Sequence, residues 1–379
     1  MKVPFFKPHL TGSEVGYVRQ AIKSLQWSGE GPFTKRCVAF LENLTDVKVM
    51  LTPSGSSALD LAIMTMDFEP GDEVILPSFT FPSTANCVVN AGLKPVFVDI
   101  RPDTLNIDEN LIEPAISPKT RAIMPVHYAG VAANMEVIRQ IAKKHSLKII
   151  EDAAHGVNAF YQNKALGSLG DLGIYSFHSS KNFSSGEGGA LLVGDPSLAE
   201  RADILRQKGT NRSRFLRGEV DKYSWVERGS NYMLSDILAA FLFAQLQQME
   251  EITQRRKALY EKYIEELSPV SQGRFRLPVI PACCQSNYHL FFIQLDSNQV
   301  RQDLMTWLTQ NGLGSATHFV PLHSSEAGRR YGVVRSKMNV TESAGSCLLR
   351  LPLFPQMQNE EIDHVIDCLK SFFERNSSP

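Results

Sequence analysis

The sequence predicts an α/β protein, with a mostly parallel seven-stranded sheet in a large domain and a smaller C-terminal α+β domain. Two observations predict this architecture. Between residues 47 and 193, short runs rich in Val, Ile and Leu alternate with helical patterns, which is typical of strands joined by helical crossovers. A long helix-forming stretch over 234–267 then precedes a shorter mixed segment, so we place the domains at 1–250 and 251–379.

The predicted elements follow one another along the chain. Strands are expected at 47–51, 74–76, 95–99, 122–126, 147–150, 173–177 and 190–193. Helices are expected among and after them at 58–66, 84–91, 111–116, 135–145 and 198–208. The C-terminal domain is expected to contain a strand at 289–295 and helices at 303–311 and 359–373. Because ligands of open α/β sheets bind beyond the carboxyl ends of the strands, residues just past each strand are candidates for chemistry.

Composition excludes several classes of function. The 379 residues carry a net charge of −1, with 43% hydrophobic and 21% charged residues, so no basic field for nucleic acid is present. No run approaches the ~20 apolar residues of a membrane span. Six cysteines without CxxC spacing, and an N-terminus unlike a secretory signal, predict a reduced, cytoplasmic protein. We expect no metal site.

Two of the segments just past strands are suited to the phosphate and the ring of a flat cofactor. Residues 52–57 join a strand to a helix, whose free N–H groups and positive dipole end favour a phosphate. The alternative is that Ser54 or Ser56 merely caps the helix. After the next strand, Phe79 or Phe81 could cover a ring face, unless both rings belong to the core.

Two further segments supply charge. Asp152 follows a buried strand, where a carboxylate is unfavourable unless it is paired; a pyridinium nitrogen would pair it, and a role as a helix N-cap is the alternative. His155 would then lie near the ring or act only as a structural histidine. Lys181 follows the strand at 173–177, where desolvation would lower its pKa and favour attachment of an aldehyde. Ser176 offers a hydroxyl to a phosphate. The four segments together assign a partner to each part of pyridoxal 5'-phosphate (PLP).

Over nearly the whole chain, the sequence resembles the DegT/DnrJ/StrS family of sugar aminotransferases, a branch of the fold-type-I PLP enzymes. The two strongest matches are Glu151-Asp-Ala-Ala-His155 and Ser176-Phe-His-Ser-Ser-Lys181. The resemblance implies that Lys181 carries PLP covalently, that Asp152 pairs with the ring nitrogen and that His155 lies by the ring. It further implies phosphate contacts from Gly55, Ser56 and Ser176, and ring stacking by Phe81.

The resemblance also implies a homodimer with shared active sites. Gly229-Ser-Asn-Tyr232 is similar to the family's segment that crosses the dimer interface, so Asn231 would reach the phosphate held by the partner subunit. Met233 stands where the family often has Arg. His318 and His323 belong to a motif near the sugar-nucleotide pocket, which makes them candidate substrate contacts; hydrogen bonding within a loop is the alternative.

A closer likeness is to the branch that makes dTDP-4-amino-4,6-dideoxygalactose. The segments that carry it are 126–130, 208–213 and 220–223. This likeness adds Tyr128 and Arg212 as candidate substrate contacts, whereas His155 replaces the Gln of that branch. It implies glutamate as amino donor, the C4 keto group of dTDP-4-keto-6-deoxyglucose as acceptor, and a product used for a lipopolysaccharide O-antigen or enterobacterial common antigen.

Three alternatives stay open, the third of which is a different class of protein: a nicotinamide-dependent enzyme, or a PLP-fold regulator or binding module. A sugar 3-aminotransferase, or another keto-sugar nucleotide aminotransferase, would use the same residues. Some relatives are dehydratases that have His in place of the lysine, and Lys181 argues against that activity. A nicotinamide enzyme would need G-x-G-x-x-G after a strand, and Gly186-Glu-Gly-Gly189 has the wrong spacing. A PLP-fold regulator would need an added DNA-binding domain.

Overall fold

The computed structural model, which describes residues 1–375, is organised around one large sheet with the strand order β1-β9-β8-β5-β4-β2-β3-β13. Its strands are β1 (Lys48–Thr52), β2 (Glu73–Pro77), β3 (Lys94–Val98), β4 (Thr120–Ile123), β5 (Lys148–Asp152), β8 (Leu172–Ser176), β9 (Gly189–Val193) and β13 (Val333–Val334). The neighbouring pairs from β8 to β13 are parallel, whereas β9 is antiparallel to both β1 and β8. The predicted α/β class with a mostly parallel sheet is confirmed.

The sheet has eight strands, so the predicted number of seven is wrong. The extra strand, β13, comes from the C-terminal part of the chain and pairs in parallel with Val96 and Phe97 of β3. It consists of Val333 and Val334 alone. Two residues are too few to show the alternation by which a strand is recognised in sequence.

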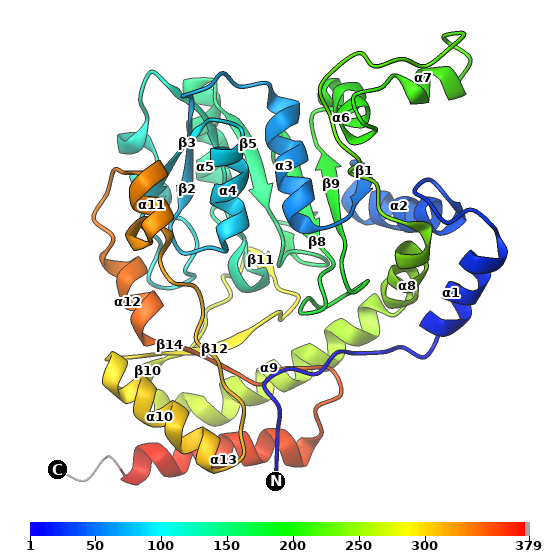
Figure 1. The fold of residues 1–379 in the computed structure, drawn as a ribbon. Coiled ribbons are helices and arrows are strands. Elements are labelled where there is room, and N and C mark those ends of the chain that lie inside the picture. Colours follow the sequence, from blue (N-terminus) through cyan, green and yellow to red (C-terminus); the bar gives the residue numbers. More distant parts are fainter. Residues whose placement is uncertain (376–379) are drawn as a thin grey trace.

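Helices cover both faces of the sheet (Figure 1). One core joins the sheet to α3 (Gly55–Met66), α4 (Pro82–Asn90) and α6 (Ala199–Arg206). The core on the other face includes α2 (Pro32–Thr45), α5 (Met135–His145) and α8 (Asp236–Gln247), with α1 (Glu14–Lys23) packed against α8. The short helix α7 (Arg212–Leu216) has no buried residue. Strands β2, β8 and β9 are buried along their whole length, as expected of a sheet covered on both faces.

Two predicted helices differ from the structure. The helix expected at 111–116 is two short 3₁₀ turns, Glu109–Leu111 and Glu113–Ala115. Pro114 has no N–H to donate, so it cannot supply an interior helix hydrogen bond. The stretch at 234–267 breaks at Gln248 into α8 and α9 (Met249–Ser271).

The C-terminal part forms a second core around a small antiparallel sheet, β10-β12-β14. The strands in this part of the chain are β10 (Phe275–Arg276), β11 (Cys284–Gln285), β12 (Phe291–Leu295) and β14 (Leu348–Leu351). The helices are α10 (Asn298–Gln310), α11 (Glu326–Tyr331), α12 (Asn339–Cys347) and α13 (Asn359–Arg375). β11 pairs instead with β6 (Phe160–Tyr161), which pairs with β7 (Lys164–Ala165).

The proposed domain boundary at residue 250 falls in the first turn of α9, and residues 376–379 of the second domain lie outside the described residues. Within residues 1–375, every helix is too short or too polar to span a lipid bilayer.

Asp99, which directly follows β3, connects the large sheet to the C-terminal part. Its Oδ1 accepts hydrogen bonds from the backbone N–H and the hydroxyl of Thr341, at 2.8 and 2.7 Å. Its Oδ2 accepts from the N–H of Val340 at 3.0 Å. Both residues are in the first turn of α12, whose own N-cap residue, Met338, makes no side-chain cap. A carboxylate distant in sequence therefore caps this helix.

We expect Asp99→Ala to lower the free energy of unfolding by about 1–3 kcal/mol, because the three donors of α12 and the N–H of Ile100 lose their acceptor. Denaturant titration followed by circular dichroism measures the change. Asp99→Asn, which keeps one acceptor oxygen, should lose less. Asp303→Ala, on an exposed face of α10, is the control. Equal stability of Asp99→Ala and the unmodified protein would show that this carboxylate does not hold α12.

Candidate active site

A cavity of about 660 Å³ opens at the carboxyl ends of the parallel strands. Its walls come from the ends of β5 and β8, the start of α3, the loop before α4, and the residues around β12 and β14. Asp152 and Lys181 both line it. The cavity therefore lies between the open edge of the large sheet and the C-terminal part. Figure 1 shows the C-terminal elements facing this edge.

A cradle of small residues forms one end of the cavity. Ser54 is the N-cap of α3, and its hydroxyl accepts the backbone N–H three residues further on at 3.0 Å. Gly55 packs so closely against β8 that an added Cβ would lie 2.9 Å from the Cβ of Ser176. Ser56 and Ser176 also line the cavity. Free N–H groups, hydroxyls and a helix N-terminus together suit a phosphate, so the structure brings the three predicted phosphate contacts together.

Asp152 is the last residue of β5 and is only 4% exposed. Its Oδ2 accepts the hydroxyl of Thr84 at 2.7 Å, and its Oδ1 accepts the N–H of Ala154 at 3.1 Å. Burial raises the pKa of this carboxyl, while the two hydrogen bonds and the charge of Lys181 oppose the rise. The carboxylate retains lone pairs toward the cavity, which fits a protonated ring nitrogen.

Lys181 lies in the loop between β8 and β9, where its backbone N–H donates to the oxygen of His178 at 2.9 Å. Burial lowers the pKa of its amine to about 8, although the nearby carboxylate of Asp152 acts in the opposite direction. The charge of Arg350 adds to the lowering. About a tenth of this amine is therefore unprotonated at pH 7, and this is the form that a nucleophile or proton acceptor requires.

Three histidines surround the amine, and burial holds the pKa of each well below its usual range, so the rings are neutral. His155 accepts a backbone N–H through Nδ1 at 3.2 Å, and its ring lies 4.3 Å from that of His289. The Nδ1 of His289 hydrogen-bonds Asn182 at 2.9 Å. The Nδ1 of His318 hydrogen-bonds the hydroxyl of Tyr128 at 2.6 Å. The cavity can thus offer neutral hydrogen-bonding groups beside its charges.

The two phenylalanine rings that could cover the face of a flat cofactor have different environments. Phe79 belongs to the core, where its ring lies 5.3 Å from that of Tyr128 and 5.4 Å from that of Phe319. Phe81 lines the cavity and is 60% exposed. Of the two, Phe81 is the ring that a flat cofactor could contact.

Several predicted site residues lie outside the cavity. His323 hydrogen-bonds the hydroxyl of Ser78 at 2.7 Å, and Arg212, on α7, donates to Gln207 at 3.2 Å. Tyr128 is buried behind His318. Asn231 is exposed, and only its backbone pairs with Gln207. These residues therefore do not reach a ligand in the cavity of their own chain.

Among the cavity residues that were not identified from the sequence are His289, Arg256 and Arg350. All three come from α9 or from the residues around β12 and β14, whose packing against the large sheet is not encoded in a local pattern. Arg350 carried one usable signal, because a charged residue inside an apolar strand is unusual unless it has a partner or a function.

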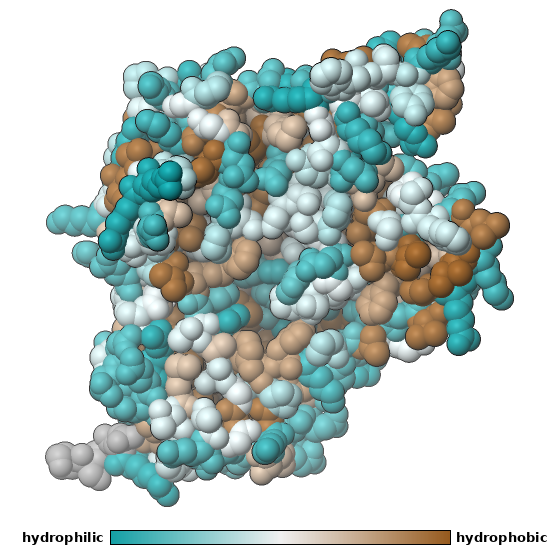
Figure 2. All heavy atoms as spheres, in the orientation of Figure 1, coloured by the Kyte–Doolittle hydropathy of each residue, from teal (hydrophilic) through white to brown (hydrophobic). Residues whose placement is uncertain are grey.

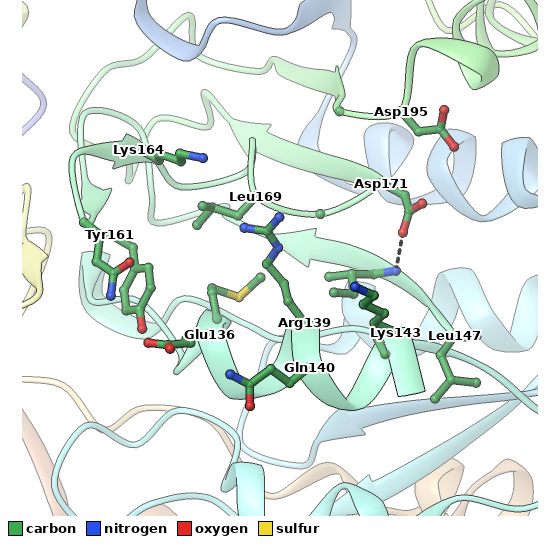
Figure 3. Close-up of a pocket in the computed structure, with 16 residues that line it drawn as sticks. Glu136, Arg139, Gln140, Lys143, Leu147, Tyr161, Lys164, Leu169, Asp171 and Asp195 are labelled. Atoms are coloured by element: carbon green, nitrogen blue, oxygen red, sulfur yellow. Dashed lines mark hydrogen bonds between the residues drawn. The ribbon is translucent and has the colours of Figure 1, made fainter. Parts of the chain in front are cut away.

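A second cavity, of about 650 Å³, lies at the opposite, amino ends of β5 and β8 (Figure 3). Its lining charges balance, with three cations against three carboxylates. They are Arg139, Lys143, Lys164, Glu136, Asp171 and Asp195. Asp171 pairs with Lys148 at 2.7 Å. None of the predicted site residues lies here, so we place the chemistry in the first cavity.

In protein freed of cofactor, we expect methylation of Lys181 by formaldehyde and cyanoborohydride to increase with pH around a midpoint near 8, because only the unprotonated amine reacts. Peptide mass spectrometry measures the reaction. The exposed Lys119 is the control for the reactivity of a surface lysine. Asp152→Asn should move the Lys181 midpoint to lower pH, because the ammonium loses a stabilising negative charge. An unmoved midpoint would contradict the electrostatic contact between the two residues.

The fold agrees with comparisons to known proteins. The aminotransferase TlmJ from Streptoalloteichus hindustanus is 29% identical, with a TM-score of 0.90 over 99% of this chain and 100% of that one. DesV of S. venezuelae is 31% identical, with a TM-score of 0.89 over 99% of each chain. Spr1654 from Streptococcus pneumoniae, in its PLP form, is 26% identical, with a TM-score of 0.91 over 100% of each chain.

Residues 8–370 match the DegT/DnrJ/EryC1/StrS aminotransferase family. The cradle at α3, the carboxylate of Asp152 and the amine of Lys181 fit the phosphate, ring nitrogen and aldehyde of PLP. The chain therefore belongs to the DegT/DnrJ/EryC1/StrS family, as a sugar aminotransferase with PLP as its cofactor.

Proposed function

We propose that this aminotransferase moves an amino group from glutamate to the C4 keto group of dTDP-4-keto-6-deoxyglucose. The product would be dTDP-4-amino-4,6-dideoxygalactose, for a surface glycan of the O-antigen or enterobacterial common antigen type. The observation that carries the amino transfer is the single cavity that holds the Lys181 amine, the Asp152 carboxylate and a phosphate cradle. The segments 126–130, 208–213 and 220–223 support the particular sugar.

Different residues of the cavity would serve different parts of the amino-transfer reaction. When bound, PLP supplies an aldehyde that joins amines and a cationic ring that draws electrons from the adjoining carbon. Asp152, held by Thr84 and Ala154, would bind the ring nitrogen and keep its proton in place. The Nζ of Lys181, with a pKa of about 8, can accept and return a proton near neutral pH, which suits it to carry the proton at the reacting carbons.

Of the proposed substrate contacts, His318 is the one on the cavity wall. Its neutral ring can hydrogen-bond a sugar hydroxyl without adding a charge. Tyr128 would hold that ring from behind, and His323 would order the loop through Ser78. We propose that Arg212, on α7, binds the nucleotide part of a substrate that lies in the cavity of a partner subunit.

We also propose a homodimer with shared active sites. Asn231 is exposed and lies outside its own cavity, which leaves its amide free to enter the cavity of a second copy. Large apolar side chains are exposed in the same part of the molecule, namely Leu25 (78%), Trp27 (50%) and Trp225 (79%). Figure 2 shows apolar side chains gathered on the surface near α1. Contact with a second copy would remove such a patch from water.

We expect incubation of the protein with L-glutamate and dTDP-4-keto-6-deoxyglucose to give a product whose C4 amine is axial by NMR. Lys181→Ala should lower turnover by about 10²–10⁴-fold, because the proton carrier and covalent anchor are lost. The exposed Lys119→Ala is the control. An amine at C3 would support the alternative, a 3-aminotransferase. Undiminished turnover by Lys181→Ala would contradict the assignment of the amine.

We expect Asn231→Ala to weaken retention of PLP during dialysis, because the cofactor phosphate loses a contact from the partner subunit. Absorbance of the bound cofactor measures retention, and the exposed Asn110→Ala is the control. A mixed dimer of Asn231→Ala and Lys181→Ala chains should contain one intact site and regain turnover. No recovery in isolated mixed dimers would show that the sites are not shared.

A further inference from the structure

The cavity contains a positive charge that has no role in the chemistry above. Arg350, on β14, lines the cavity together with Lys181 and Asp152. Its Nε and Nη2 both donate to the backbone oxygen of Thr317, at 3.1 and 2.8 Å. Among residues 1–375, no carboxylate is within ion-pair distance of this guanidinium, and Nη1 has no hydrogen-bond partner. Arg350 therefore keeps its charge and donors for another group.

Another arginine shows what a purely structural guanidinium looks like in this protein. Arg335 donates through Nη1 and Nη2 to both carboxylate oxygens of Glu73, at 2.8 and 2.7 Å. Such a fork-to-fork pair compensates the loss of water on burial. Arg350 is desolvated enough that burial lowers its pKa, yet no acid accompanies it. A guanidinium in this state indicates an anion that arrives from solution.

The protein holds this guanidinium in one orientation. The backbone of Arg350 pairs with Phe292 of β12 on one side and with Ala316 on the other. The Thr317 oxygen fixes one edge of the guanidinium plane, and the ring of Phe5 lies 4.9 Å from its central carbon. A planar fork that is already oriented loses little freedom when it binds a planar carboxylate.

Arg350 is also the arginine whose charge acts on the pKa of the Lys181 amine. After burial, its charge helps to lower the pKa values of Lys181, His155 and His318. Arg256 also lines the cavity, but its donors are directed to the backbone oxygens of Tyr288 and His289. The anion that pairs with Arg350 should therefore lie beside the bond-making centre.

The two substrates place their negative charges differently. An amino acid bears a carboxylate on the same carbon as the amine that it gives up. In a hexose nucleotide, the diphosphate is attached at C1, across the sugar ring from C4. An anion site close to the reacting amine matches the first arrangement better than the second.

We propose that Arg350 binds a carboxylate of the amino donor through the free edge of its guanidinium. The proposal rests on the proposed function in requiring an amino-acid donor, and it is independent of which sugar accepts the amine. It assigns to the C-terminal part of the chain the recognition of the first substrate, while the large sheet holds the cofactor.

Equilibrium binding separates the two sources of anion. Isothermal titration of the PLP-loaded protein with 2-oxoglutarate, the donor's deaminated form, and with dTDP measures each contact without turnover. We expect Arg350→Met to weaken 2-oxoglutarate binding about tenfold to hundredfold, since a charge-assisted hydrogen-bonded pair is lost, and to leave dTDP binding within about twofold. Arg350→Lys, which keeps the charge without the fork, should weaken it less.

The matched control is Arg139→Met, because Arg139 lines the second cavity at the opposite end of the sheet (Figure 3). Circular dichroism and the content of bound PLP establish that each variant is folded; if Arg350→Met is not, Arg350→Lys carries the test. Weakened dTDP binding with unchanged 2-oxoglutarate binding would assign Arg350 to the diphosphate and overturn the proposal. Equal binding of both ligands by Arg350→Met and the unmodified protein would overturn it as well. Failure of the proposed function would appear instead as absence of the C4 amine with unmodified protein.

Discussion

Two opposite charges buried in one cavity, the Lys181 amine and the Asp152 carboxylate, determine how the rest of the site is built. Removal from water disfavours the charged form of each, and the two charges partly compensate one another. Thr84 and Ala154 keep the carboxylate in place by donating to both of its oxygens. The Lys181 amine can gain or lose a proton near neutral pH, which amino transfer needs. The neutral histidines around it add no further charge.

The open edge of the sheet could be predicted from sequence because it depends on local patterns. Alternating strands and helices fix a parallel sheet, and the sheet brings together whatever follows its strands. The helix at Met135–His145 was predicted with its observed bounds, since its apolar residues recur with helical spacing and basic residues fill its last turn. Asp152 and Lys181, far apart in sequence, were thereby expected in one place.

Other features depend on packing that no local pattern records. The two-residue strand β13 and the short strands β6, β7 and β11 carry too few residues to show a period. The sequence alone could not decide between Phe79 and Phe81, because both rings flank the same strand end; tertiary packing buries the first and leaves the second at the cavity. His289 and Arg350 reach the site only because the C-terminal part folds back over the sheet edge.

The C-terminal part is also attached to the large sheet at the edge formed by β13. There β13 extends the large sheet, Asp99 holds the start of α12, and Arg335 is locked onto Glu73. A hinge-like swing of the C-terminal part away from the sheet would have to break all three attachments at once. We therefore expect substrates to enter and leave by rearrangement of side chains and loops at the rim of the cavity. The large sheet and the C-terminal part, which form its two walls, would stay in contact throughout.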